Sequence, residues 1–368
     1  MHRVASLHFT LSVLSSAVVY DQLSTLPAPV LHTFGLQFFP TAVHDQLVAK
    51  PLPTSLFASS CPSISDLQLD GVELQSPLDI PDFLTPAKSL TLDYGNERTV
   101  FPMDVMEKFA GLRRLTIRGS NLFLPKEPTA RRFTAWSELV FLELQCPAYV
   151  CDVLLESDAL QAIPYLVVSG SSAFRCPGFM SHLRGDLVLR CSSRRSSGEI
   201  TTTLRSAKTG HERTLRTSFA HFAAAHGPTP GIVSYCPDYS GYNSVLGMIA
   251  VANRVVSCEV SADIWHVFSD ALMSLPRCSS LTFVLDDRRS LTRYMAPAPV
   301  LPCPALERVV LKASCERVTV RMPELARLLK SALPPSEKRR LVLENVDLEG
   351  DMKLLRGVVD IRSTSRQW

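Results

Sequence analysis

The chain lacks a strong excess of charge of either sign, a long uninterrupted apolar run and the compact motifs of common enzymes. Its 368 residues include 38 Lys and Arg against 35 Asp and Glu, a formal net charge of +3. That balance is too even to predict a nucleic-acid-binding or membrane-surface protein. No stretch reaches the ~18–20 consecutive apolar residues that a membrane-spanning helix needs. With 46% hydrophobic and 20% charged residues, the composition is that of a globular chain and excludes a wholly disordered one.

Sequence signatures of catalysis are missing as well. The chain has no Gly-x-Gly-x-x-Gly or Walker loop, no His-Glu-x-x-His and no Gly-x-Ser-x-Gly. It also has no Cys-x-x-Cys pair and no Cys/His cluster with zinc spacing. Asp286 and Asp287 are followed at once by two arginines, which favours a solvated, self-neutralising turn over a metal site. We therefore expect no enzyme, no cofactor and no metal.

The ten cysteines are spread along the whole chain, which is long enough to build a core without disulfides. They are Cys61, Cys146, Cys151, Cys176, Cys191, Cys236, Cys258, Cys278, Cys303 and Cys315. We expect reduced, buried thiols and an intracellular protein of the cytoplasm or nucleus. A secreted protein with disulfides stays open as the alternative, because the apolar stretch from Val4 to Val19 also fits a secretory signal. Alternation of apolar and polar residues in that stretch favours a half-buried strand instead.

Leucine, with 51 residues, recurs in an apolar-x-x-Leu-x-Leu pattern. The second apolar anchors of the first six repeats are Leu67, Leu90, Leu115, Leu142, Leu166 and Leu187. Their steps of 21 to 27 residues fall within the ~20–29 residue period of leucine-rich repeats. Both leucines of a Leu-x-Leu strand point to one face, so stacked repeats bury a continuous core behind a parallel sheet. The pattern predicts an α/β fold: one irregular leucine-rich-repeat solenoid over residues 1–368, with parallel strands on the concave face and helices or loops on the convex face.

Return segments with helical spacing support this fold. We expect helices within Pro102–Gly111, Asp152–Leu160 and Met322–Lys330. Between residues 192 and 280 the leucine spacing is lost, which leaves degenerate repeats and an insert as alternatives. Strands are still expected there because Thr, Val and Ile are enriched in three segments. These segments are Glu199–Leu204, Gly231–Tyr235 and Arg254–Val260.

The best candidate for a functional surface is the sheet face opposite the leucines. Equivalent positions on parallel strands lie side by side, ~4.8 Å apart, and form ladders. The candidate residues lie between or just after the two leucine anchors: Gln68, Asp70, Thr91, Asp93, Thr116, Arg118, Glu143 and Gln145. Mixed charges of this kind suit protein recognition, and a solvated face without a ligand is the competing interpretation. A contact between Asp93 and Arg118 would then be an ordinary surface ion pair.

A second candidate is the segment Arg184–Arg216, which holds eight basic side chains against three acidic ones. An acidic partner or nucleic-acid phosphates would suit this charge. The segment has no interleaved aromatic residues for base stacking, and its Ser and Gly content predicts exposed loops. We therefore expect no nucleic-acid partner.

Several segments resemble the repeats of fungal F-box and leucine-rich-repeat proteins. Leu52-Pro-Thr-Ser-Leu-Phe57 precedes a Pro and the strand motif that runs to Leu74, and Pro302–Leu311 resembles the late repeats of that family. The resemblance implies a substrate-recognition region of a ubiquitin-ligase receptor, with a protein partner on the concave face. The family's F-box docks a Skp adaptor and usually opens Leu-Pro-x-Glu-x-Leu. In Leu26–Leu31 a proline, Pro29, replaces the acidic residue, so the resemblance implies the repeat part without its F-box, or a truncated relative with no active role.

Overall fold

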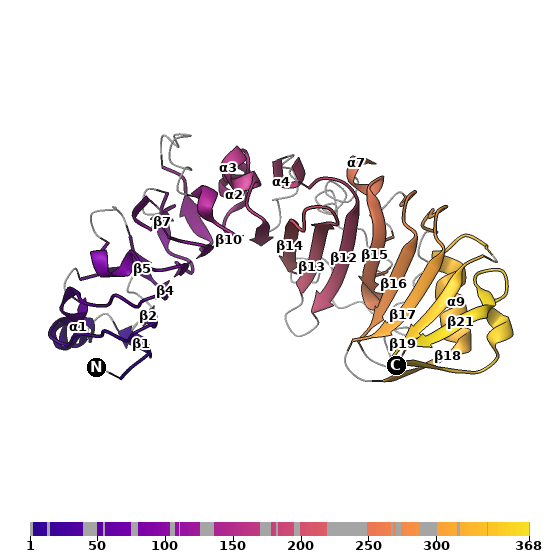
Figure 1. The fold of residues 1–368 in the computed structure, drawn as a ribbon, viewed down its shortest axis with the longest axis horizontal. Coiled ribbons are helices and arrows are strands. Elements are labelled where there is room, and N and C mark those ends of the chain that lie inside the picture. The colour runs from indigo at the N-terminus through magenta and orange to yellow at the C-terminus, as the bar shows by residue number, and fades with distance from the viewer. Residues whose placement is uncertain are drawn as a thin grey trace, which may run out of the picture. The chain divides into compact units, whose positions relative to one another are not determined.

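The computed structural model describes most of the chain. The described residues are 3–12, 15–39, 50–53, 56–74, 80–103, 107–109, 111–125, 136–169, 178–181, 183–194, 199–218, 249–265, 268–269, 274–286, 300–314, 317–336 and 338–367. They form an α/β structure with a large, open, mostly parallel sheet and few helices (Figure 1). The chain divides into two compact units, Met1–His182 and Leu183–Trp368, which we call the N-terminal and C-terminal units.

All the main strands of the N-terminal unit are parallel and follow one another in chain order. They are β1 (Ser6–Ser12), β2 (Thr33–Phe39), β4 (Asp66–Asp70), β6 (Ser89–Asp93), β8 (Arg114–Arg118), β10 (Phe141–Gln145) and β11 (Tyr165–Ser169). Two small parallel pairs accompany them: β3 (Lys50–Pro51) with β5 (Val72–Glu73), and β7 (Arg98–Val100) with β9 (Asn121–Phe123). Five of the six predicted leucine anchors are confirmed as one continuous register, since Leu67, Leu90, Leu115, Leu142 and Leu166 pair in turn. The sixth, Leu187, does not continue this register, because it lies on β12 of the C-terminal unit and pairs with β13 and β15.

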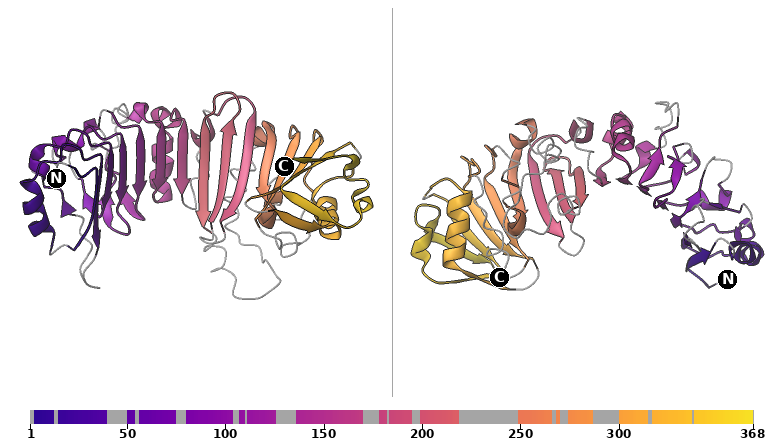
Figure 2. Two further views of the ribbon diagram at one scale, coloured as in Figure 1. Left: turned by 60° about the horizontal axis from the view of Figure 1, so that its bottom comes forward. Right: turned by 180° about the vertical axis from the view of Figure 1, so that it is seen from behind.

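One face of this sheet is covered by helices and turns (Figure 2). These are α1 (Ser16–Ser24), η1 (Leu56–Ser59), η3 (Asp82–Leu84), α2 (Ala148–Leu155), α3 (Asp158–Gln161) and α4 (Gly178–Ser181). The buried leucines pack there against aromatic rings. Phe57 meets Phe34 and Phe83 edge-to-face at centroid distances of 5.2 and 5.8 Å, and Phe101 stacks on Trp136 at 6.1 Å. Edge-to-face and offset stacked geometries are the ones aromatic pairs prefer, and they help to fix the spacing between turns.

The C-terminal unit has a mixed sheet. Its strands, in spatial order, are β14 (Glu212–Ser218), β13 (Glu199–Ser206), β12 (Leu187–Arg194), β15 (Val255–Ser261), β16 (Ser280–Leu285), β17 (Arg308–Ala313), β19 (Arg340–Glu344) and β21 (Asp360–Gln367). β12, β13 and β14 pair in antiparallel fashion, and the pairs from β12 through β15 to β21 are parallel. A further parallel pair joins β18 (Val318–Arg321) and β20 (Val346–Glu349).

Few helices accompany this sheet: α7 (Ile249–Ala252), η8 (Ala262–Ile264), α9 (Met322–Ala332) and η9 (Met352–Leu355). The core row Cys258, Leu281, Val309 and Leu341 runs in register across four strands, and all four side chains are buried. Trp265 closes the core against Phe283, with 5.0 Å between the ring centroids.

The helix predicted within Met322–Lys330 is confirmed as α9, with a proline in its first turn. The segment Asp152–Leu160 contains the end of α2 and the start of α3. The prediction of one helix is therefore met by two, which are separated by Glu156 and Ser157. Parts of Pro102–Gly111, and the whole of Gly231–Tyr235, lie outside the described residues. The predicted strands at Glu199–Leu204 and Arg254–Val260 are confirmed as β13 and β15.

The region 192–280 changes strand direction. The chain leaves β12, pairs back through β13 and β14, and returns as β15 on the other side of β12, parallel to it. Degenerate repeats and an insert both stay predictions for this region. The assignment of residues 1–368 to one solenoid also stays a prediction. No helix among the described residues is long and apolar enough to cross a membrane.

Candidate functional site

The uncovered face of the N-terminal sheet carries three parallel rows of side chains, which we call the open face. On β4, β6 and β8 buried apolar residues alternate with partly exposed ones; β4, for example, buries Leu67 and Leu69 and exposes Gln68. β10 and β11 bury their middle residues as well, Glu143 and Val167. The strands pair without a shift from β2 to β11, so equivalent positions stay aligned over six strands. A flat array of side chains on a rigid backbone is suited to binding an extended surface.

The structure brings all eight predicted site residues together on this face. The central row runs Gln68, Thr91, Thr116 and Glu143, and the row at the carboxyl ends of the strands runs Asp70, Asp93, Arg118 and Gln145. Gln68 and Gln145 are exposed, and five of the others are half-buried. Glu143 differs, because it is only 6% exposed. Whether these residues bind a protein is a matter for experiment.

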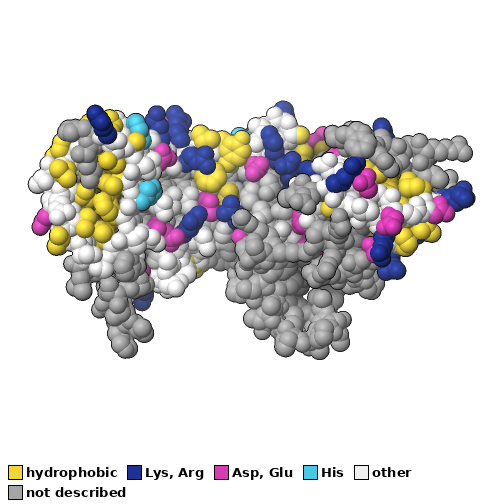
Figure 3. Space-filling model, turned by 90° about the horizontal axis from the view of Figure 1, so that it is seen from below, with side chains coloured by type: hydrophobic (Ala, Val, Ile, Leu, Met, Phe, Trp, Pro, Cys, Tyr) yellow, Lys and Arg dark blue, Asp and Glu magenta, His cyan; other side chains and the backbone are white. Residues whose placement is uncertain are grey.

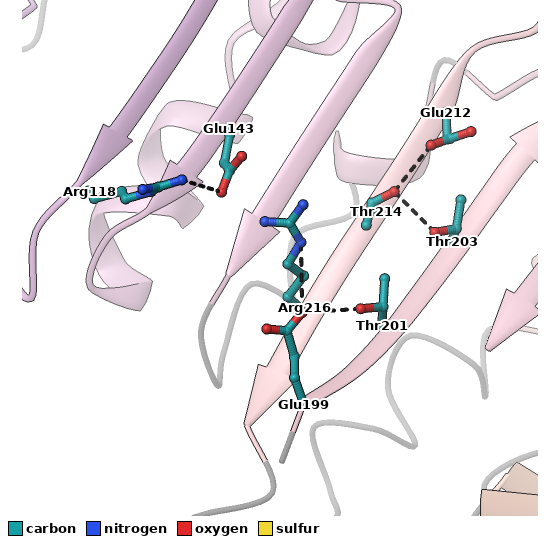
Figure 4. A network of polar contacts seen from close by, with 8 residues as sticks. All are labelled: Arg118, Glu143, Glu199, Thr201, Thr203, Glu212, Thr214 and Arg216. Carbon is teal, nitrogen blue, oxygen red and sulfur yellow. Dashed lines mark hydrogen bonds and ion pairs between the residues drawn. The ribbon is translucent and has the colours of Figure 1, made fainter. Parts of the chain in front are cut away.

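An ion pair organises the centre of the open face. Arg118 Nη2 on β8 lies 3.6 Å from Glu143 Oε1 on β10 (Figure 4). The solvated-face interpretation allowed a contact between Arg118 and Asp93, but among the described residues the ion pair of Arg118 is the one with Glu143. Asp93 Oδ1 instead accepts a hydrogen bond from the backbone N–H of Gly95 at 2.9 Å, because the turn after β6 presents that donor.

Asp70 stands beside Asp93 at the same register position on the neighbouring strand. Burial raises the pKa of the Asp70 carboxyl, and the negative charge of Asp93 raises it further. A hydrogen bond from Gln68 Nε2 to Asp70 Oδ2 at 3.3 Å and the nearby charge of Arg118 act in the opposite direction. The two carboxylates therefore repel each other on a surface that supplies only partial compensation.

Our sequence analysis missed the third row, which precedes the first leucine of each strand. It contains Asp66, Ser89, Arg114, Phe141 and Tyr165. Arg114 lies over the Phe141 ring, 4.9 Å from its centroid, a cation–π arrangement. Tyr165 is 41% exposed. The period-2 alternation could have identified this row, since the residue before a Leu-x-Leu pair must face the same side as the residue between the leucines.

His8 extends the central row onto the first strand. It pairs in register with Gly35, and Gly35 pairs with Gln68. A Cβ atom on Gly35 would stand 2.0 Å from His8 Nδ1, so the imidazole lies across the glycine and occupies the place of its missing side chain. At the next row, Thr10 Oγ1 donates to Gln37 Oε1 at 3.4 Å. In Figure 3, side chains of both charge signs lie on the surface of this unit beside an apolar area.

Most of the described part of the basic segment Arg184–Arg216 is strand, so the expectation of exposed loops is wrong there, while residues 195–198 lie outside the described residues. The strands are β12, β13 and β14. Arg213 is buried, and burial lowers the pKa of its guanidinium to about 10. Arg216 Nε lies 3.8 Å from Glu199 Oε1, and Thr203 and Thr214 share a hydrogen bond of 3.1 Å (Figure 4). Internal pairing of this kind leaves less charge for a phosphate partner.

The acidic, histidine and cysteine side chains of the described residues were compared with the arrangements that bind metals. The part of the chain that the structure describes holds no group of three or more His, Cys, Asp or Glu side chains placed to bind a metal. Seven cysteines are described, and all of them are buried and free of disulfides: Cys61, Cys146, Cys151, Cys191, Cys258, Cys278 and Cys303. Asp287, for which the sequence favours a solvated turn over a metal site, lies outside the described residues.

The described residues thus offer a surface of aligned side chains. Comparisons of the chain with protein-family models, with curated proteins and with solved structures gave no match.

Proposed function

We propose that the chain is a non-enzymatic recognition protein that binds a protein partner on the open face of its N-terminal unit. The observation that carries the proposal is the open face itself. Seven strands in one register hold three rows of side chains, most of them polar, charged or aromatic, and the apolar layer behind them is buried on β4, β6, β8, β10 and β11. The leucine layer fixes the backbone, so the open-face side chains are presented with little loss of backbone entropy on binding.

In this proposal the repeats belong to an irregular leucine-rich-repeat solenoid with the open face on its concave side. The short strands at steps of 23 to 27 residues from Leu67 to Leu166, each followed by a turn or helix on the covered side, support that arrangement. The similarity of Leu52–Leu74 to fungal F-box repeat proteins adds a role, the recognition of a substrate for a ubiquitin ligase. The adaptor would have to be reached through a divergent F-box or a separate chain. We place this activity inside the cell.

A pull-down of the full chain expressed in a fungal cell tests the proposal, with captured proteins identified by mass spectrometry and the Skp adaptor probed separately. Thr116→Arg puts a long cation in the middle of the open face, where Thr116 is half-buried. The matched control is Thr25→Arg at the exposed end of α1, away from the sheet. We expect the first variant to lose partners that wild type and control retain.

Thermal unfolding of all three proteins shows whether the variants fold. Equal recovery of every partner by folded Thr116→Arg protein contradicts recognition at the open face. Recovery of the adaptor together with substrates supports the ligase role, and recovery of other partners without the adaptor leaves a recognition scaffold that acts outside that ligase.

A further inference from the structure

Strand β1 forms the outer edge of the N-terminal sheet. Among the described residues it pairs with β2 alone. Leu7 and Phe9 on β1 are half-buried, whereas Phe34 and Leu36, which are in register with them on β2, are fully buried. Hydrophobic side chains gather at this end of the molecule (Figure 3), and Val18 on α1 is 62% exposed. A further strand beside β1 would complete the burial of Leu7 and Phe9.

The backbone of β1 directs hydrogen-bonding groups outward along this edge. The N–H group of Thr33 donates to the Ala5 carbonyl oxygen at 3.1 Å, so the backbone groups of Ala5 point toward β2. Successive residues of a strand point their N–H and C=O groups to opposite sides. Those of Ser6, His8 and Thr10 therefore point away from β2. An edge of this kind is a template for pairing with another strand.

The carboxyl end of the edge is closed by the chain itself. Ser12 is the next residue whose backbone points outward; its N–H donates to Ser15 Oγ at 3.1 Å, and its carbonyl oxygen accepts from the Ser15 N–H at 3.2 Å. The open part of the edge is therefore 6–10. At its centre the His8 imidazole lies across Gly35, over β2 and not over the edge.

The sequence of the open edge fits a second copy of itself. In an antiparallel pair, two residues whose backbone groups face each other exchange both hydrogen bonds. A pair centred on His8 sets His8 opposite His8 and Ser6 opposite Thr10, and it uses every outward group of the open edge. It also sets Leu7 opposite Phe9 on the buried side of the sheet, where an aromatic side chain beside an aliphatic one stabilises the pair.

Charge does not oppose this pairing. Residues 4–20 contain no Asp, Glu, Lys or Arg, so two copies bring no such like charges together at the edge. The last strand of the C-terminal sheet, β21, differs because its sequence includes Asp360, Arg362 and Arg366. Charged side chains protect edge strands against pairing with other chains. The edge at β1 lacks that protection.

We propose that the chain forms a homodimer in which two β1 strands pair in antiparallel fashion about His8 and join the two N-terminal sheets into one. This inference does not depend on the proposed function. The two-fold axis of such a pair is perpendicular to the sheet, so both open faces lie on the same side of the joined sheet. The dimer would thus bind a partner with repeated sites more tightly than one copy does.

Sedimentation velocity of the full chain tests the dimer from about 1 to about 100 μM. The measurement is made at pH 8, at which imidazole groups are ordinarily uncharged. We expect the wild-type chain to pass from monomer to dimer over this range. Thr10→Pro removes an outward N–H and no bond to β2, and proline is tolerated on edge strands in this position. It should weaken dimerisation by at least about tenfold.

Two charge variants test the register. Ser6 and Thr10 are exposed and lie ~13 Å apart along one strand, so they meet only across the dimer. Ser6→Lys/Thr10→Lys sets lysine opposite lysine and should weaken dimerisation by at least about tenfold, whereas Ser6→Lys/Thr10→Glu sets lysine opposite glutamate and should retain it. Ala207→Lys/Thr209→Lys adds the charge of the double-lysine variant to an exposed turn between β13 and β14, and should dimerise as wild type does.

Circular dichroism and thermal unfolding identify any variant that fails to fold. A wild-type chain that stays monomeric at about 100 μM overturns the inference. Dimerisation that folded Thr10→Pro and the double-lysine variant leave unchanged places the contact elsewhere and overturns it too. Equal dimerisation of the double-lysine and lysine–glutamate variants contradicts an antiparallel pair centred on His8.

Discussion

Arg118 on β8 pairs with Glu143 on the neighbouring strand β10, and the two residues differ sharply in burial. The Glu143 side chain is 8% exposed, whereas that of Arg118 is 41% exposed. Removing a carboxylate from water costs free energy, and the charge of Arg118 offsets part of that cost. The pair therefore has a structural role in the open face as well as any role in binding.

Removing the arginine should destabilise the fold. We expect Arg118→Ala to lower the free energy of unfolding by about 1–2 kcal/mol, a value reduced because Arg118 is partly solvated. Urea denaturation measures the change. Arg113→Ala is the matched control: its ion pair with Glu138 spans 3.2 Å, but both side chains are more than half exposed. Arg113→Ala should lower the free energy of unfolding by under about 0.5 kcal/mol beyond any loss of packing. Equal losses in Arg118→Ala and Arg113→Ala would contradict the role of burial.

Asp70→Asn should stabilise the protein at neutral pH. The pKa of Asp70 is raised in the folded state, so the folded chain binds more protons than the unfolded chain over the interval between its two pKa values. Stability from this group is therefore lost as pH rises through the interval and regained as pH falls. We expect a higher Tm for the variant at pH 7.5, with the difference shrinking as the pH is lowered. Differential scanning calorimetry across that range measures it.

Asp66→Asn is the control for this measurement. Asp66 is exposed, and its Oδ2 accepts a hydrogen bond from the Ser65 hydroxyl at 2.7 Å, so the substitution removes a favourable contact and relieves little repulsion. A Tm gain equal to that of Asp70→Asn would argue against strain between the two carboxylates.

Much of the N-terminal sheet could be predicted from the sequence. A strand buried on one face must alternate apolar and polar residues, and Leu-x-Leu at regular steps identifies both the strands and their common face. The same alternation says nothing about strand direction. Glu199–Ser206 alternates as cleanly as the parallel strands do, yet it pairs in antiparallel fashion with β12.

Side-chain partners on the open face could not be predicted. Arg118 has acidic neighbours on both sides in the sequence pattern, and only the three-dimensional structure reveals that it contacts Glu143 and that Asp93 bonds the turn at Gly95. Local packing and competing hydrogen-bond donors decide which neighbouring strand a long side chain contacts. The spacing of the strands does not specify that contact.

Gly35 and His8 should be energetically coupled. Adding a methyl group at Gly35 places a Cβ atom 2.0 Å from His8 Nδ1, so the imidazole must move. We expect Gly35→Ala to destabilise the chain by about 1 kcal/mol when His8 is present, and by much less in the His8→Ala background, where alanine also lowers the entropy of the unfolded state. A double-mutant cycle in urea measures the coupling. Additive effects would show that the imidazole does not lie across the glycine.

The thiols provide a test of compartment and of the core together. Burial raises the pKa of Cys278 to about 11 and of Cys303 to about 12, so at pH 8 both remain protonated thiols, which are poor nucleophiles. We expect the described cysteines to react with a thiol reagent only after denaturation, when an intracellular protein should yield all ten thiols. Few thiols after denaturation without reductant would instead support the secreted, disulfide-containing alternative, because disulfides persist in oxidising compartments. Fast reaction of the native protein at Cys278 or Cys303, identified by peptide mapping, would contradict the burial of these side chains.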